Sequence, residues 1–426
     1  MPRRRHQQSL PDADPAEMLG RDFRSFAEAH GREGNQVWTM PVNVHRDRRR
    51  ARADQNNPME RSEFLDVDHV LEAKVDKLAE MLLQSAHTVT YTGAGISRAA
   101  GLPDYATDDD DGLDRGGHVL RNVPLLGGEE LWHLAQPTLA HECIAALIRE
   151  GRVAHCVNQN HDGLFEKAGV PAWKVNNIHG DWFDPSNRVV QYNQNLRKDK
   201  IADLTEHAEL AQMVIAAGTS LSGMTADNIV LDAGKKHKRG QGLGFVLINL
   251  QKTEHDANSS LRIWAPIDTV ISKLLLRLGI SRLPVISPPL LKERVFELSH
   301  YLPSGKRRDG ENELSLGSLT LSLNVGDQVH VADVKANNFG MVMDVKEWDK
   351  EGNVVFNVRK NLRCRPVDTE IFGRWFIYAA LEGQLQWVPV INEDKKPAKQ
   401  GISKKGSSAT TSSSSSSSAN KRHKKE

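Results

Sequence analysis

The 426-residue chain holds 56 lysines and arginines against 55 aspartates and glutamates, a formal net charge of +1. No overall charge therefore favours a polyanionic partner, and the length allows two or three domains. Three cysteines, Cys143, Cys156 and Cys364, are too few for a disulfide framework, which indicates a reducing compartment. No apolar run is long enough to span a bilayer, and no hydrophobic segment follows the N-terminal arginines as in a secretory signal, so we expect no membrane partner.

The two ends of the chain differ from its middle in composition. Residues 1–62 are polar with arginine clusters, which predicts a disordered basic N-terminal region. Residues 283–313 are proline-rich and then basic, as in a linker, and residues 395–426 hold a serine tract followed by a basic run. We expect the last segment to be a disordered Ser/Lys-rich tail. Its basic run can serve as a nuclear import signal or can merely keep the chain soluble.

Residues 63–282 alternate between apolar runs and helical patterns. Leu71, Val75, Leu78 and Leu82 recur at helical spacing just before the first apolar run. Strands that alternate with helices predict an α/β fold, a Rossmann-like parallel sheet with helices on both faces. Expected strands cover residues 88–92, 153–157, 174–178, 213–217 and 245–248. Expected helices cover residues 138–149, 162–168 and 269–278.

Residues 314–394 follow a different pattern, of short apolar runs separated by glycine and asparagine. Evenly spaced short strands predict a small all-β domain that resembles a barrel. Expected strands cover residues 329–331, 341–345, 354–358, 375–379 and 385–390.

Polar or glycine-rich clusters follow the expected strands of residues 63–282 one after another. Because ligands bind beyond the carboxyl ends of the strands in open parallel sheets, this repetition predicts one ligand site along a single sheet edge. Glycines and hydroxyls suit a pyrophosphate, and amides and carboxylates suit a ribose or a carboxamide. A neutral histidine at a strand end can act as a general base, although a lone histidine is more often structural. The clusters are Gly93-Ala94-Gly95, residues 158–162, His179-Gly180, Gly218-Thr219-Ser220 and Asn249.

These clusters resemble the motifs of the sirtuins, the NAD-dependent protein deacylases. The run from Gly93 through Ile96 and Ser97 to Asp104 and Tyr105 is similar to the opening sirtuin signature. The later clusters follow the family's order over about residues 70–280, and some details lean toward its nuclear class IV branch. The similar later motifs are Gln159-Asn160-x-Asp162, Ile178-His179-Gly180, Gly218-Thr219-Ser220-Leu221 and Ile248-Asn249-Leu250-Gln251.

The resemblance implies an activity and roles for residues. A sirtuin-type enzyme transfers the acyl group of a protein lysine to ADP-ribose and releases nicotinamide, so NAD is the implied cofactor. His179 would accept a ribose hydroxyl proton, and Asn160 and Asp162 would place the ribose and share the catalytic role. Asp104 would hold the nicotinamide carboxamide. The implied NAD-binding residues are Gly93, Ala94, Gly95, Ser97, Asp104, Tyr105, Gln159, Asn160, Asp162, His179, Gly218, Thr219, Ser220 and Asn249.

Three departures from the family pattern affect the prediction. One is that the interval between Gly180 and Gly218 is shorter than in the family. Family members carry two Cys-x-x-Cys pairs after the His-Gly motif, whereas no cysteine lies between Gly180 and Gly218, so we expect no zinc. Ala106 stands where the family has arginine, and an acidic run, residues 108–111, follows. A deacylase remains the leading hypothesis. An inactive NAD or ADP-ribose reader acting as a chromatin scaffold, and a mono-ADP-ribosyltransferase, remain open alternatives.

The resemblance also implies a partner and a location. We expect an acylated-lysine protein as substrate, with a histone as one candidate, and a nuclear location. The basic ends of the chain can contact nucleic acid or chromatin, although solvated loops explain them equally well.

Overall fold

The computed structural model describes the chain from residue 21 to residue 392, with gaps. The described residues are 21–47, 61–104, 119–120, 123–124, 126, 133–191, 194–222, 225–282, 288–333, 338–358 and 369–392. The predicted disordered tail lies outside them. Within these residues, no helix combines the length and apolar character needed to cross a membrane.

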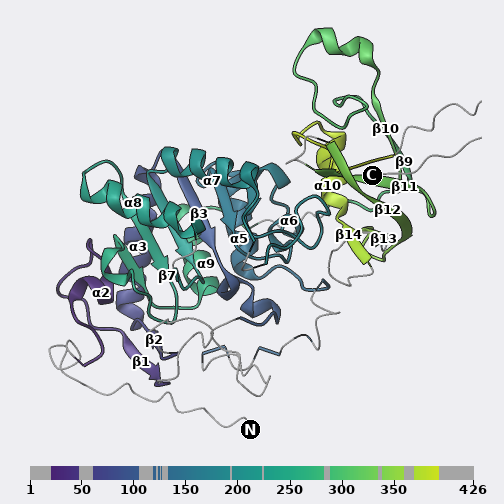
Figure 1. Cartoon of the computed structure of the whole chain (residues 1–426). Coiled ribbons are helices and arrows are strands. Elements are labelled where there is room, and N and C mark those ends of the chain that lie inside the picture. Colours follow the sequence, from purple (N-terminus) through teal and green to yellow (C-terminus); the bar gives the residue numbers. More distant parts are fainter. Residues whose placement is uncertain are drawn as a thin grey trace, which may run out of the picture. The chain divides into compact units, whose positions relative to one another are not determined.

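A six-stranded parallel sheet forms the centre of the N-terminal half (Figure 1). Its order is β5-β4-β3-β6-β7-β8, and in the central strand Val89 pairs with His155 on one side and Val214 on the other. Strands β3, β6 and β7 are buried throughout, as expected of strands covered on both faces. The strands are β3 (Thr88–Thr92), β4 (His155–Asn158), β5 (Val175–Asn177), β6 (Met213–Ala217), β7 (Gly244–Ile248) and β8 (Leu261–Ile263).

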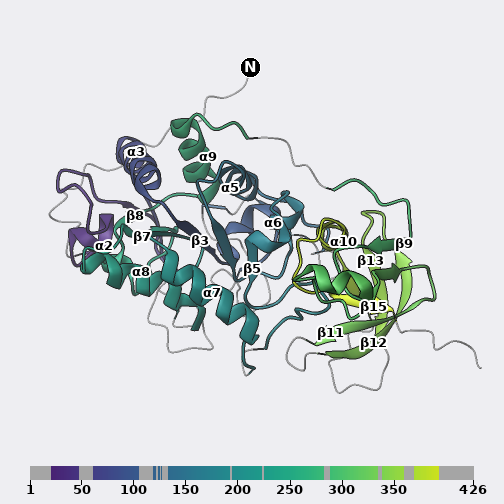
Figure 2. The same ribbon diagram turned by 90° about the horizontal axis from the view of Figure 1, so that it is seen from above.

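Helices cover both faces of this sheet, which confirms the predicted Rossmann-like architecture (Figure 2). One face packs against α3, α5 and α9, and the other against α7 and α8. Thr138 caps α5 at its start, where its hydroxyl accepts a hydrogen bond from the His141 amide. The helices are α3 (Asp68–Gln84), α5 (Leu139–Arg149), α6 (Leu164–Lys167), α7 (Lys198–Leu210), α8 (Asn228–Lys238) and α9 (Ile267–Leu278).

The prediction of disorder for residues 1–62 is wrong for residues 21–47. This segment forms α2 (Phe26–His30) and β1 (Val42–His45), which pairs with β2 (Glu63–Leu65). Phe23 packs against Phe64 and Trp264 with ring centroids 5.2 and 5.5 Å away. The few apolar side chains of this polar segment are thus enough to anchor it, because they are buried against other aromatic side chains.

Antiparallel strands dominate the C-terminal part, as predicted, but three expectations need correction. Residues 385–390, expected as a strand, contribute only Val390 to one, at the start of β15 (Val390–Asn392). Residues 375–379, expected as a strand, belong to α10 (Arg374–Leu381), because one apolar aromatic run can serve either element. The expected linker contains β9 (Val295–Leu298), which pairs with β10 (Leu319–Ser322). A five-stranded sheet has the order β14-β13-β12-β11-β15. Its strands are β11 (Gln328–Asp333), β12 (Asn338–Trp348), β13 (Val354–Val358), β14 (Thr369–Phe372) and β15 (Val390–Asn392).

Candidate functional site

The topology of the parallel sheet defines where a ligand site is expected. From β3 the chain fills one side of the sheet with β4 and β5, and then returns to β6 to fill the other side. The carboxyl ends of β3 and β6 therefore flank the switch point, where open α/β sheets bind ligands. Gly93 follows β3 and Gly218 follows β6, so the two predicted glycine loops meet at this place.

The glycines of the two loops are required by their close approach to each other. A Cβ on Gly93 would lie 2.7 Å from the Gly218 carbonyl oxygen, and one on Gly95 would lie 2.7 Å from the Gly218 Cα. Gly218 itself has φ +64°, a left-handed conformation that favours glycine. The glycine pattern is thus explained first by loop packing.

Several amides predicted to face a phosphate already have partners. The Gly93 amide donates to Ala217 O at 3.1 Å, and the Gly95 amide donates to Gly218 O at 3.0 Å. The Ser97 amide donates to Ala94 O at 3.0 Å. In this conformation, a phosphate contact through Gly93 or Gly95 would require one of these bonds to open.

A chain of hydrogen bonds connects four predicted site residues. The Asn160 side-chain amide donates to Gly93 O at 3.1 Å and to Ser97 Oγ at 3.0 Å. Ser97 Oγ donates in turn to Asp162 Oδ2 at 2.6 Å, and Asp162 is buried. The loop after β4 is therefore fixed to the loop after β3 through side chains that sequence motifs had singled out.

His179 lies just beyond β5. Its Nε2 is buried, and no described group forms a hydrogen bond with it. Burial, and then the neighbouring His161, lower the pKa of His179 to about 4, although a hydrogen bond with the Gln159 main chain acts in the opposite direction. The imidazole is therefore neutral near pH 7 and holds an unused nitrogen lone pair or N–H.

The loops after β6 and β7 are also joined. Gln159 Nε2 donates to Thr219 Oγ1 at 3.0 Å, and Asn249 Nδ2 donates to Thr219 O at 3.3 Å. Ser220 Oγ donates to Ser222 Oγ at 3.1 Å. Thr219 thus links residues that follow β4, β6 and β7 along the same sheet edge.

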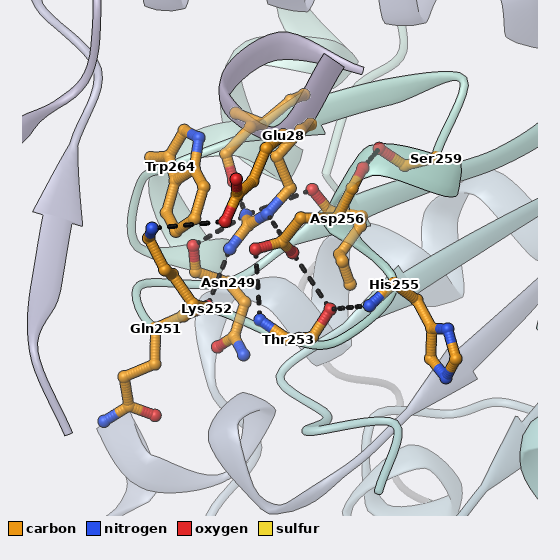
Figure 3. Close-up of polar contacts among 12 residues, drawn as sticks. Glu28, Asn249, Gln251, Lys252, Thr253, His255, Asp256, Ser259 and Trp264 are labelled. Carbon is orange, nitrogen blue, oxygen red and sulfur yellow. Dashed lines mark hydrogen bonds and ion pairs between the residues drawn. The ribbon is translucent and has the colours of Figure 1, made fainter. Parts of the chain in front are cut away.

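A buried arginine on the edge strand holds the segment that carries Asn249. Arg262 donates to Asn249 O at 2.9 Å and to Gln251 O at 2.7 Å, and it forms an ion pair with Asp256 at 2.9 Å. Its guanidinium carbon lies 3.3 Å from the centroid of the Trp264 ring. Figure 3 shows the polar contacts of this region, including Asn249, Asp256 and Trp264. Position 262 has a positioning role that its local sequence did not indicate.

Asn158 belongs to the predicted cluster at residues 158–162, but the sequence did not indicate a role for it. It is fully buried at the end of β4, where its Oδ1 accepts from Thr92 Oγ1 at 2.9 Å and its Nδ2 donates to Asn177 Oδ1 at 3.0 Å. It therefore ties together the carboxyl ends of three neighbouring strands. Its place directly before Gln159 was the available signal.

Some predicted features fall outside these contacts. Tyr105, Ala106 and the acidic run at residues 108–111 lie outside the described residues. Asp104 is half-buried at the end of the described segment. The roles assigned to individual residues in nucleotide binding remain predictions.

Comparisons with known proteins found sequence similarity to NAD-dependent protein deacetylases. No protein-family model matches the chain. The NAD-dependent protein deacetylase SRT1 of Arabidopsis thaliana is 28% identical over 274 residues, which are 56% of this chain and 55% of SRT1. The NAD-dependent protein deacetylase Sirt6 of Drosophila melanogaster is 28% identical and aligns with 51% of this chain and 79% of its own length. The chain is therefore similar in sequence to sirtuins.

The shared region is only part of each protein. The chain spans about half the length of SRT1, at 55%. Human sirtuin-7, an NAD-dependent protein deacetylase, is 25% identical over 66% of this chain and 78% of its own length. A solved Sir2 structure with a propionylated peptide aligns with 49% of this chain at 23% identity and a TM-score of 0.40, too low to support a structural argument.

Proposed function

We propose that this chain is a sirtuin-type deacylase that uses NAD to remove an acyl group from protein lysine. The observation that carries the proposal is His179, whose buried Nε2 lacks a described partner beside the loop of Gln159 and Asn160. A buried polar atom without a partner is costly, so a ligand that supplies one would be favoured. The deacetylase names of the sequence relatives support the same conclusion.

The residues at the switch point suit NAD. Bound NAD would supply a ribose that accepts the acyl group and nicotinamide as the leaving group. Neutral His179 would accept a proton from a ribose hydroxyl at Nε2. Asn160 and Asp162, already fixed through Ser97, would orient the ribose, and Thr219, Ser220 and Asn249 would hold the rest of the nucleotide.

The substrate and location form the finer part of the proposal. An acyl-lysine protein substrate follows from the proposed chemistry, and a histone is one candidate. The basic run at the end of the chain supports a nuclear location and contact with chromatin. The matches to Sirt6 and sirtuin-7 support a place near the class IV branch.

The proposal is tested by nicotinamide release from NAD, measured with an acylated peptide and with the same peptide unacylated. Release that requires the acyl group, together with formation of O-acyl-ADP-ribose, supports deacylation. Binding of NAD without release would favour the inactive reader. Release without the acyl group, with ADP-ribose attached to protein, would favour the ribosyltransferase.

A further inference from the structure

Two histidines and one carboxylate form a cluster at the amino end of β4. The proposed NAD site lies at the carboxyl ends of the parallel strands. His155 is the first residue of β4, whereas Asn160 and Asp162 follow the last residue of that strand. Asp203 and His207 lie on α7 four residues apart, which places them on the same side of the helix. Helix α7 lies beside β5 (Figure 2). Nothing in the proposed acyl transfer uses these three side chains.

The three side chains present nitrogen and oxygen atoms to one small volume. His155 Nε2 lies 3.0 Å from Asp203 Oδ2, and His207 Nε2 lies 3.9 Å from Asp203 Oδ1. One donor atom from each residue lies within 4.8 Å of the others. A tetrahedral zinc bound at about 2.0–2.2 Å places its ligand atoms about 3.3 Å apart, so the three side chains would rotate to bring their donor atoms closer together.

The surrounding groups hold these side chains in place. Asn176 Nδ2 donates to Asp203 Oδ2 at 2.6 Å and to Lys200 O at 2.8 Å. His87 Nε2 lies 3.2 Å from His207 Nδ1. If His207 Nδ1–H donates to His87, the His207 Nε2 lone pair is left available for a metal. Outer hydrogen bonds of this kind orient the ligands of metal sites.

The two imidazole rings lie side by side. The His155 and His207 rings stack with centroids 3.8 Å apart, and a ring nitrogen of each lies within 4 Å of the Asp203 carboxylate.

Nearby lysines oppose a cation, but hydrogen bonds direct at least two of them toward main-chain oxygens. Lys236 Nζ donates to the Ala208 and Glu209 carbonyls at the end of α7, and Lys174 Nζ donates to Ala154 O. The mouth of the cluster is open to solvent through Asp203, whose side chain is 37% exposed, while that of His155 is 2% exposed.

We propose that His155, Asp203 and His207 bind one divalent ion of the zinc class, with water as the fourth ligand. Two imidazoles and a carboxylate are a donor set that zinc accepts. The ion would fasten α7 to the start of β4 and so act in stability. It is separate from the cysteine-bound zinc of the sirtuin pattern, for which this chain has no cysteines between Gly180 and Gly218.

The test titrates Co²⁺, as a spectroscopic probe for zinc, into the tag-free full chain after chelation. We expect one equivalent to bind with visible absorption typical of four-coordinate cobalt, displaced by Zn²⁺, and to raise the melting temperature. His207→Gln should lose this band, while the exposed control His69→Gln should keep it. His87→Phe should weaken binding by about 10- to 100-fold, because it removes only an orienting contact.

Circular dichroism of each variant separates lost binding from lost folding. A folded His207→Gln or Asp203→Asn chain that binds Co²⁺ as tightly as the wild type would overturn the proposal. So would a wild-type chain that shows no stoichiometric binding. If His207→Gln unfolds, His87→Phe decides the question, and unchanged Co²⁺ affinity in that folded variant counts against the site.

Discussion

At the scale of single residues, two structural requirements apply to Gly218, one on its backbone conformation and one on the space around it. Its φ is +64°, and an added Cβ would lie 2.6 Å from the Ile96 amide nitrogen. The first feature makes any other residue strained, and the second leaves no space for a side chain. The glycine of the Gly-Thr-Ser motif is therefore needed to bring the loop after β6 against the loop after β3.

Gly218→Ala is expected to lower the free energy of unfolding by about 2–4 kcal/mol, from backbone strain and overpacking together. Gly151→Ala is the matched control, because Gly151 has φ +68° but nothing within 4 Å of an added Cβ. It should lose about 1–2 kcal/mol, from strain alone. Urea unfolding measures both. Equal losses in the two variants would show that the close approach of the two loops at Gly218 does not contribute to stability.

At the scale of elements, the edge strand β8 depends on Arg262. The guanidinium is fully buried, pairs with buried Asp256 and holds the carbonyls of Asn249 and Gln251. Because the charge is completely removed from water, its hydrogen bonds and its partner must all be present. This contact network explains how a short strand can fix the loop that contains Asn249.

Arg262→Met should destabilise the chain by about 3–5 kcal/mol, because it leaves the Asp256 carboxylate buried without its cation. Adding Asp256→Asn to that variant should recover part of the loss, since the unpaired charge is then removed. Denaturant unfolding of the two single variants and the double variant gives the coupling. Additive losses would contradict a direct ion pair between the two residues.

The regular elements near the site followed closely from the sequence. Residues 88–92 and 213–217 form strands with the expected limits, because their apolar runs are bounded by glycine or polar residues. The short strand β8 was missed, since Arg262 interrupts an apolar run of only a few residues. Helix α7 was missed because its polar sequence buries little beyond Leu204.

The sequence predicted only part of the site, because several of its contacts join segments that are far apart in the chain. Motif order brought the glycine loops, Asn160 and Asp162 to one sheet edge, and the strand order agrees with that placement. The sequence could not indicate that the Gly93 and Gly95 amides bond to neighbouring carbonyls, because those contacts join segments far apart in the chain. The same limit applies to His155, Asp203 and His207, whose proximity depends on how α7 packs.

At the scale of the whole molecule, buried histidines set the response to acid. Burial lowers the pKa of His141 to about 4, and burial followed by Lys74 lowers the pKa of His30 to about 3. The unfolded chain protonates these groups near pH 6.5 while the folded chain does not, so stability falls as the pH drops from 6.5 toward 4. Glu166 opposes this trend, because burial raises its pKa to about 7.

His141→Gln removes one of these histidines from the start of α5. We expect its loss of stability between pH 6.5 and 4 to be about 3 kcal/mol smaller than that of the wild type, from the lowered pKa of His141. Urea unfolding at several pH values measures the slope, which is independent of any constant cost of the substitution. The exposed control His69→Gln should keep the wild-type slope, and an equal slope in His141→Gln would contradict the assignment.

The most direct test of the central claim measures NAD-dependent deacylation of an acylated peptide by His179→Ala, with NAD affinity measured in parallel. Removal of a general base should slow formation of the deacylated peptide by at least about 100-fold while NAD still binds, and His69→Ala should act like the wild type. Unchanged deacylation by His179→Ala would contradict the account, because the buried Nε2 of His179 would then have no part in the reaction.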